Sequence, residues 1–135
     1  MQGSISGAAI TRATDAMLRV LGGDSVSLLF SALGLPDDPA AQLGLTDPGV
    51  EEVAFAPVVV RTLPTDSNGP RRRLQFLIPG SAVAEAVVDR NITGAEQLFQ
   101  SALGISYDGD LFHIVNVATE YFAGTAYLFL VEAVE

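Results

Sequence analysis

The C-terminal segment, residues 105–135, constrains the fold more than any other part of the chain. Residues rich in Ile, Val, Phe, Tyr and Leu lie on both sides of a turn that carries Gly124. β-Branched and aromatic residues favour strands, and glycine permits the tight turn that joins them. The segment therefore predicts a β-hairpin in a small β-rich scaffold that contacts its neighbours through its sheet.

The last strand of this hairpin is apolar on both faces. Successive side chains along a strand point to opposite faces. One face would carry Tyr127, Phe129 and Val131, and the other Leu128, Leu130 and Val134. A strand of this kind is buried on both sides, in a core or between subunits, so Tyr127 and Phe129 are candidate protein contacts.

Length and composition predict one folded domain over residues 1–135. The chain is 49% apolar and long enough to bury a packed core. It has no cysteine, which excludes disulfides and thiolate metal sites. No stretch approaches the roughly twenty apolar residues of a membrane span, and the N-terminus lacks the pattern of a signal peptide, so we expect an intracellular soluble protein.

The charge is strongly acidic. Sixteen acidic residues face seven basic ones, all of them arginine, and the formal net charge is −9. A domain of this charge repels the phosphate backbone of nucleic acids. The acidity fits an ordinary soluble surface, and it also fits a wall past which DNA slides without binding.

The N-terminal segment predicts a helix over residues 6–21. Ile10, Ala13, Met17 and Leu21 fall near one face, and Gly22-Gly23 supplies a stop. This face would pack on the body of the domain, or on a neighbouring subunit if the helix projects. Ile10, Met17 and Leu21 are therefore candidate contact residues.

A strand is predicted over residues 25–33, followed by a long irregular stretch over residues 34–49. Proline and glycine at this density resist regular structure. Loops of more than about a dozen residues are uncommon in compact domains and often functional. The stretch carries Leu35, Leu43 and Leu45, which would anchor it on an apolar surface. It is either a docking loop or a plain connector.

A second hairpin is predicted in the middle of the chain. Residues 51–63 form a strand in which Pro57 marks an edge, a bulge or a strand start, because proline cannot donate to the ladder. Residues 64–70 form a turn, and residues 74–78 the returning strand. The cluster Arg71, Arg72 and Arg73 beside the turn would dock on an acidic protein surface, or would only keep the strand start solvated.

Two short helices complete the expected elements. One covers residues 81–89 with Ser81 as its cap, and the other runs from a Thr93–Glu96 capping box to Gly104. The fold class is therefore α+β with mainly antiparallel sheet. We expect a small barrel or sandwich with two or three short helices.

The sequence offers little catalytic chemistry. His113 is the single histidine, and a general base also needs an orienting carboxylate and a nucleophile. The acidic pair in Tyr107-Asp108-Gly109-Asp110 fits a tight turn better than a calcium loop. The glycines form no nucleotide-binding pattern. We therefore expect no catalytic residues, no metal and no cofactor.

Two segments together resemble the neck proteins of tailed bacteriophages, the head-completion or head–tail connector proteins. The first pairs the strand from Phe55 with Leu74-Gln-Phe-Leu-Ile-Pro-Gly-Ser-Ala-Val. The second is Gly109-Asp-Leu-Phe-His-Ile-Val-Asn-Val, followed by Gly124-Thr-Ala-Tyr-Leu and a terminal strand. The resemblance covers about the C-terminal two-thirds of the chain. Tail terminators, which often begin with a helix, are the nearest alternative.

The resemblance implies structural work in a virion. Such proteins look like ring-forming parts between portal and tail, assembled in the cytoplasm of the host bacterium. The partners would be copies of the same chain, the portal or adaptor, and tail proteins, while DNA passes through the lumen without specific binding. Two other classes stay open. One is a small barrel that binds a hydrophobic ligand in a pocket lined by Phe76, Phe112 and Phe129, and the other is an enzyme that uses His113.

Overall fold

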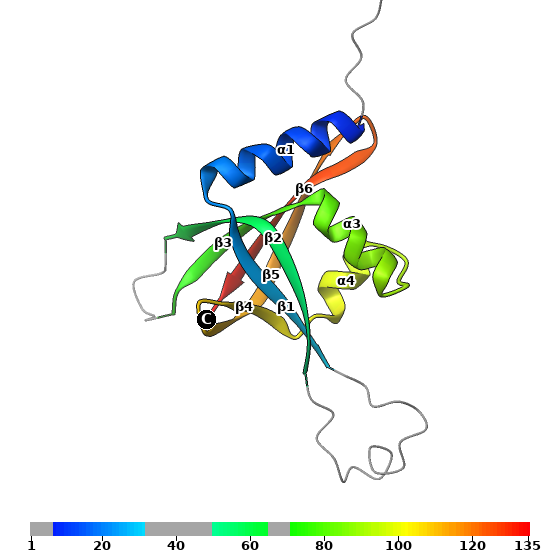
Figure 1. Cartoon of the computed structure of the whole chain (residues 1–135). Helices are drawn as coiled ribbons and strands as arrows, with labels where there is room; N and C mark the ends of the chain where they lie inside the picture. Colours follow the sequence, from blue (N-terminus) through cyan, green and yellow to red (C-terminus); the bar gives the residue numbers. More distant parts are fainter. Residues whose placement is uncertain (1–6, 32–49, 65–70) are drawn as a thin grey trace, which may run out of the picture.

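The computed structural model describes residues 7–31, 50–64 and 71–135, which form a closed antiparallel barrel with three helices (Figure 1). The barrel order is β1-β2-β3-β6-β5-β4. The strands are β1 Asp24–Ser31, β2 Val50–Leu63, β3 Arg73–Pro79, β4 Gly104–Tyr107, β5 Asp110–Phe122 and β6 Thr125–Val134. The helices are α1 Gly7–Leu21, α3 Gly80–Asp89 and α4 Ala95–Ser101.

This architecture confirms the expected small α+β barrel with mainly antiparallel sheet. Both predicted hairpins are present, because β2 pairs with β3 and β5 pairs with β6. The long stretch predicted over residues 34–49, with Leu35, Leu43 and Leu45, lies outside the described residues. So does nearly all of the turn predicted over residues 64–70.

Two tight turns connect the C-terminal strands. Asp108 and Gly109 join β4 to β5 with φ values of 52° and 83°. Ala123 and Gly124 join β5 to β6 with φ values of 51° and 77°. Two consecutive positive φ values are typical of the type I′ turn, whose twist matches that of the flanking strands. Both turns were predicted from the sequence.

Pro57 lies where β2 changes partner. The register with β1 passes from Val26–Phe55 to Asp24–Val58, so the segment around Pro57 bulges. Beyond it, β2 pairs with β3 from Val59 onward. The bulge lets one long strand belong to both halves of the barrel, and it confirms one of the three alternatives predicted for Pro57.

Side chains fill the interior of the barrel. Phe76 and Phe112 are completely buried and meet edge to face, with ring centroids 6.0 Å apart. Tyr107 meets Phe76 in the same way at 5.8 Å. Aromatic rings therefore occupy the space between Phe76 and Phe112, where the ligand-binding alternative places part of its pocket. Phe129 is 4% exposed and belongs to the same core, which is one of the two places predicted for the side chains of this strand.

Helices α3 and α4 lie side by side against the barrel and contribute Val83, Ala86, Leu98 and Phe99 to the core (Figure 1). Their caps differ from the prediction. Pro79 is the N-cap of α3, and Ser81 instead donates a 2.9 Å hydrogen bond to Asp15 of α1. Before α4, both the backbone N–H and the hydroxyl of Thr93 donate to Gln97. Gln97 therefore fills the place predicted for Glu96.

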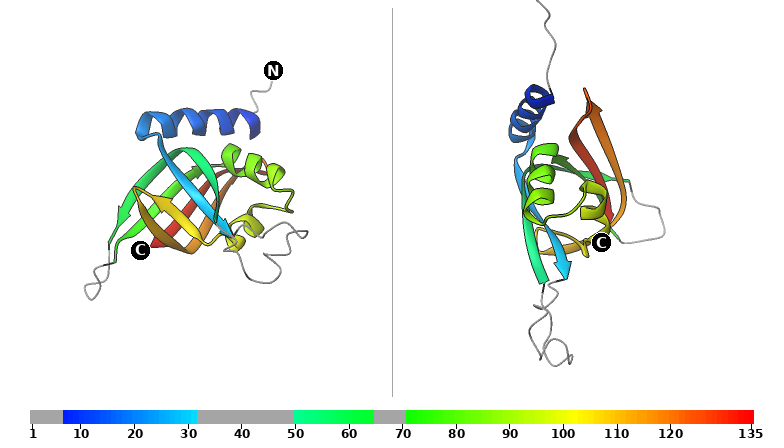
Figure 2. Two further views of the ribbon diagram at one scale, coloured as in Figure 1. Left: turned by 60° about the horizontal axis from the view of Figure 1, so that its bottom comes forward. Right: turned by 90° about the vertical axis from the view of Figure 1, so that its right-hand side faces the viewer.

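Helix α1 lies across the outside of the barrel and contacts β2, β3 and β6 (Figure 2). These strands carry an outward row of half-buried side chains, Val59, Leu77 and Leu130, placed side by side by the strand register. The row accounts for the prediction that β6 is apolar on both faces.

The face of α1 that packs on the barrel differs from the prediction. Thr14 and Leu18 are buried and Ile10 is half-buried, whereas Met17 and Leu21 point to solvent. Residues four apart lie on one helix face. Thr14 can be buried because its hydroxyl donates a 2.8 Å hydrogen bond to the Ile10 carbonyl.

Candidate interaction surfaces

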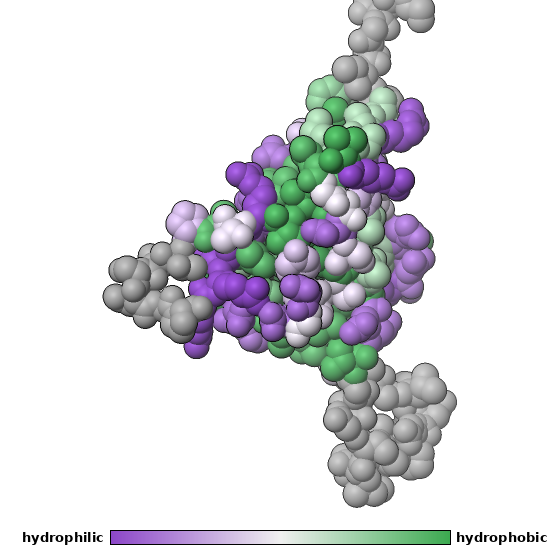
Figure 3. Space-filling view, turned by 60° about the vertical axis from the view of Figure 1, so that its left-hand side comes forward, coloured by the Kyte–Doolittle hydropathy of each residue, from purple (hydrophilic) through white to green (hydrophobic). Residues whose placement is uncertain are grey.

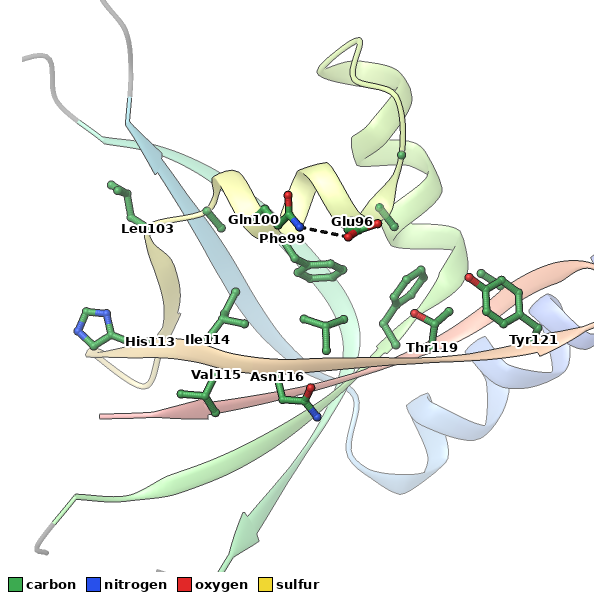
Figure 4. A pocket seen from close by; sticks show the side chains of 16 residues that line it. Glu96, Phe99, Gln100, Leu103, His113, Ile114, Val115, Asn116, Thr119 and Tyr121 are labelled. Atoms are coloured by element: carbon green, nitrogen blue, oxygen red, sulfur yellow. Dashed lines mark hydrogen bonds between the residues drawn. The ribbon is translucent and has the colours of Figure 1, made fainter.

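An open groove lies between α4 and the inner face of the β5–β6 hairpin, with a volume of about 940 Å³ (Figure 4). We call it the α4–β5 groove. Polar and apolar groups line it in about equal measure. The residues that define it are Phe99 of α4, Ile114, Val117, Thr119 and Tyr121 of β5, and Phe129 of β6.

The groove exists because β4 is much shorter than β5. The pairing of β4 with β5 covers only the register from Tyr107–Asp110 to Ile105–Phe112. From His113 onward, the described strands pair with β5 on one edge alone, through β6. Helix α4 faces the other side of this extension without closing it, and Ile114 and Thr119 point toward the helix (Figure 4).

Polar groups lie at the rim and ends of the groove, and Thr119 adds a hydroxyl within its wall. Glu96 and Gln100 of α4 are joined by a 3.2 Å hydrogen bond at the rim. His113 is exposed at one end (Figure 4). No hydrogen bond joins His113 to a carboxylate within the described ranges. The groove can therefore hold an apolar body with polar edges, and its geometry supplies no acid–base pair.

The second uncovered surface is the outer face of α1, formed by Ala13, Ala16, Met17, Val20 and Leu21. Met17, Val20 and Leu21 are 61%, 86% and 62% exposed. Ile10, Thr14 and Leu18 adjoin this face on the side toward the barrel, and Arg12, Asp15 and Arg19 occupy the remaining side of the helix. Figure 3 shows hydrophobic residues along this part of the surface.

The two surfaces lie on different sides of the molecule. Gly7 begins α1 in contact with Thr125, beside the β5–β6 turn, and Gly22 follows the helix near Val59 of β2. The strongly exposed end of the outer face is therefore at β2, away from the hairpin tip. Helix α4, whose residues line the α4–β5 groove, lies on another side of the barrel (Figure 2). A single subunit cannot bring them together.

The predicted arginine cluster is partly used within the chain. Arg72 forms ion pairs with Asp110 and, at 2.6 Å, with Glu135. Its guanidinium lies 5.2 Å from the centroid of Phe112. Arg73 Nε lies 3.3 Å from a Glu132 carboxylate oxygen, an ion pair whose geometry falls short of a hydrogen bond. Arg71 is exposed and has no ion pair among the described residues, so it alone remains free to dock elsewhere.

The hydrogen bonds from Arg72 to Glu135 and Asp110 raise the pKa of its guanidinium, with Glu135 contributing most. The backbone N–H of Glu135 also donates to the Arg72 carbonyl at 3.0 Å. Arg72 therefore fastens the start of β3 to the start of β5 and to the chain end after β6. Of the two roles predicted for the arginine cluster, the solvated strand start is closer to this structural role than docking on another protein.

The remaining predicted contacts have mixed surroundings. Tyr127 is half-buried at the second bulge between β5 and β6, where the register passes from Glu120–Leu128 to Tyr121–Ala126. Within the described ranges, no group of three His, Cys, Asp or Glu side chains could hold a metal ion. In the same ranges, no helix is long and apolar enough to cross a membrane.

The sequence analysis did not identify the α4–β5 groove. The feature that could have revealed the groove is the unequal length of the β-favouring segments before and after Asp108-Gly109. A strand that extends beyond its partner leaves one edge unpaired. Comparison of the chain with protein-family models, with curated proteins and with solved structures finds no match.

Proposed function

We propose that this protein is a non-enzymatic structural subunit of a ring in the neck of a tailed-phage virion, between portal and tail. The observation that carries the proposal is the pair of uncovered apolar surfaces on different sides of one small barrel. Contiguous exposed apolar surface commonly marks a protein interface. When one surface of each copy binds a different surface of the next copy, the copies form a ring if the rotation between successive copies adds up to a full turn.

The charge of the chain supports the same role. A formal net charge of −9 disfavours stable contact with DNA, as the lumen of a neck requires. The resemblance in the two β-hairpins adds the position in the virion. Within the neck we favour head completion or head–tail connection, with a tail-terminator ring as the nearest alternative because of α1. The partners would be the portal or adaptor and the tail proteins.

Purification through an affinity tag on this chain, from cells that produce the particles, tests the proposal. We expect portal, capsid and tail proteins to co-purify in fixed ratio, identified by mass spectrometry. The tagged Val20→Glu variant, which carries a charge on the outer face of α1, should recover smaller amounts of these portal, capsid and tail proteins. Recovery of the unmodified chain alone, or with metabolic enzymes, would overturn the neck role.

A second candidate function has one specific observation in its favour. Phe99 and Phe129 approach each other in the wall of the groove, with centroids 5.6 Å apart, and an apolar groove of this size could hold a hydrophobic small molecule. The filled barrel interior leaves this groove as the place for such a ligand. Saturable binding of a hydrophobic fluorescent probe to a stable monomer, lost in Thr119→Trp, would favour the ligand-binding barrel.

A further inference from the structure

We propose that the outer face of α1 of one copy occupies the α4–β5 groove of the next copy. This inference rests on the proposed ring and names the two surfaces that build it. Both surfaces belong to the same chain, both carry apolar side chains, and each lacks a cover within the described subunit. One is a convex helix face and the other is a concave groove.

The side chains of the helix face suit the groove. Val20 is the most exposed large apolar side chain of the described residues, and Met17 and Leu21 flank it. Methionine adapts to irregular apolar surfaces because its side chain is unbranched. The side chains of Ala13 and Ala16 are small, which allows the helix backbone to approach α4 and β5 of the neighbouring copy closely. An amphipathic helix set into an apolar groove is a recurrent mode of recognition.

The charges of the two surfaces are complementary. The exposed charged side chains of α1 are Arg12 and Arg19, and neither has an ion pair among the described residues. The third charged residue of α1, Asp15, is held by Ser81. The rim of the groove carries the carboxylate of Glu96. A positive helix edge therefore meets a negative rim, which favours this pairing over α1 against α1.

The positions of the surfaces set the symmetry. Contact between different surfaces of identical subunits is heterologous, so a pair of copies still has one free helix face and one free groove. A two-fold dimer would satisfy both surfaces only if they were adjacent, and they lie on different sides of the barrel (Figure 2). The contact therefore propagates from copy to copy, and it builds the proposed ring when the rotation between successive copies closes.

Site-directed crosslinking tests this contact, and the cysteine-free chain makes each introduced thiol unique. One copy carries Val20→Cys. A second copy, of different size through its tag, carries Thr119→Cys or Gln100→Cys, one on each wall of the groove. The matched control carries Val88→Cys, which is 76% exposed on α3 and outside the groove. Both copies are produced together with the particles, and a short bis-maleimide is added.

We expect crosslinked pairs of unequal size with Thr119→Cys or Gln100→Cys at a level at least five-fold above the Val88→Cys control. Levels equal to that control, in particles that contain both copies and the portal, would overturn the contact while leaving the neck role intact. A second result would also overturn the contact. In it, both cysteine variants are absent from particles that contain the unmodified chain, while Val20→Ser is incorporated normally. Absence of the unmodified chain from particles would overturn the neck role itself.

Discussion

Arg72 holds one corner of the barrel together. It pairs with Asp110 at the start of β5 and with Glu135 after β6. We expect Arg72→Ala to lower the midpoint of thermal unfolding more than Arg71→Ala, because Arg71 has no ion pair in the described structure. The difference should shrink in about 1 M salt, where exposed charges are screened within a few ångströms. Calorimetry at low and high salt checks this, and an equal effect of the two changes would contradict it.

Tyr107 gives stability a pH dependence at alkaline pH. Burial raises the pKa of its hydroxyl, Asp24 and Asp108 raise it further, and Arg72 opposes them. A raised pKa in the folded state means that the protonated form stabilises the fold. This contribution is complete below the unfolded pKa of about 10 and is lost as the pH rises through the folded value.

We therefore expect the phenolate absorbance of Tyr107, measured as the difference between the unmodified chain and Tyr107→Phe, to appear at a higher pH than that of an unfolded tyrosine. Stability should fall more steeply above pH 10 in the unmodified chain than in Tyr107→Phe. Urea unfolding at pH 8 and pH 11 measures the difference. Equal loss of stability in both proteins would show that Tyr107 does not contribute.

Ala123 occupies a left-handed backbone conformation in the β5–β6 turn, with φ of 51°. This conformation costs an L-residue roughly 1–2 kcal/mol, whereas glycine adopts it freely. We expect Ala123→Gly to raise the free energy of unfolding by up to about 1 kcal/mol, since the flexibility of unfolded glycine offsets part of the gain. Ala118→Gly, in the regular part of β5, should lower it by roughly 0.5–1 kcal/mol. Chemical denaturation of both variants checks the opposite signs.

At the scale of elements, α1 has two apolar faces with different functions. Leu18 is 3% exposed against the barrel, while Leu21 is 62% exposed on the outer face. Leu18→Ala should cost about 2–5 kcal/mol of unfolding free energy, because it leaves a cavity. Leu21→Ala should change it by less than about 0.5 kcal/mol. Denaturation of the two variants distinguishes them, and a large effect of Leu21→Ala in the monomer would contradict the assignment of faces.

The sequence predicted the elements better than their packing. Asp108-Gly109 and Gly124 located two turns because their positive φ values need particular residues. The predicted face of α1 is largely uncovered in the subunit, because the barrel contacts the neighbouring Thr14 and Leu18 and periodicity alone could not rank the two. Thr14, a polar residue, is buried through its bond to the Ile10 carbonyl. Such local satisfaction of a hydroxyl is invisible to hydropathy.

The groove could not be read from the sequence for a related reason. It arises where β5 outlasts β4 and α4 stops short of closing the gap, so it depends on three elements that meet in space. Phe129 looked like a contact residue because it alternates with Leu128 and Leu130. The alternation of side chains along β6 does not say which face points into the core. The pairing of β6 with β3 and β5 determines that face.

At the scale of the whole molecule, assembly should depend on the outer face of α1 while folding does not. Val20→Glu replaces a side chain that is 86% exposed, so the monomer should unfold within about 0.5 kcal/mol of the parent. Its incorporation into particles should fall at least ten-fold, because a carboxylate would be buried in the apolar groove. Val88→Glu, on exposed α3, is the matched control and should enter normally. Equal incorporation of both variants would contradict the role of α1.

Electron microscopy of complexes purified through this chain tests the central claim most directly. The account predicts a ring of barrels between portal and tail, with α1 of each copy against α4 and β5 of its neighbour. A ring in which α1 faces solvent would contradict the proposed contact. Complexes that contain this chain as a single copy, or particles whose neck lacks it, would contradict the structural role.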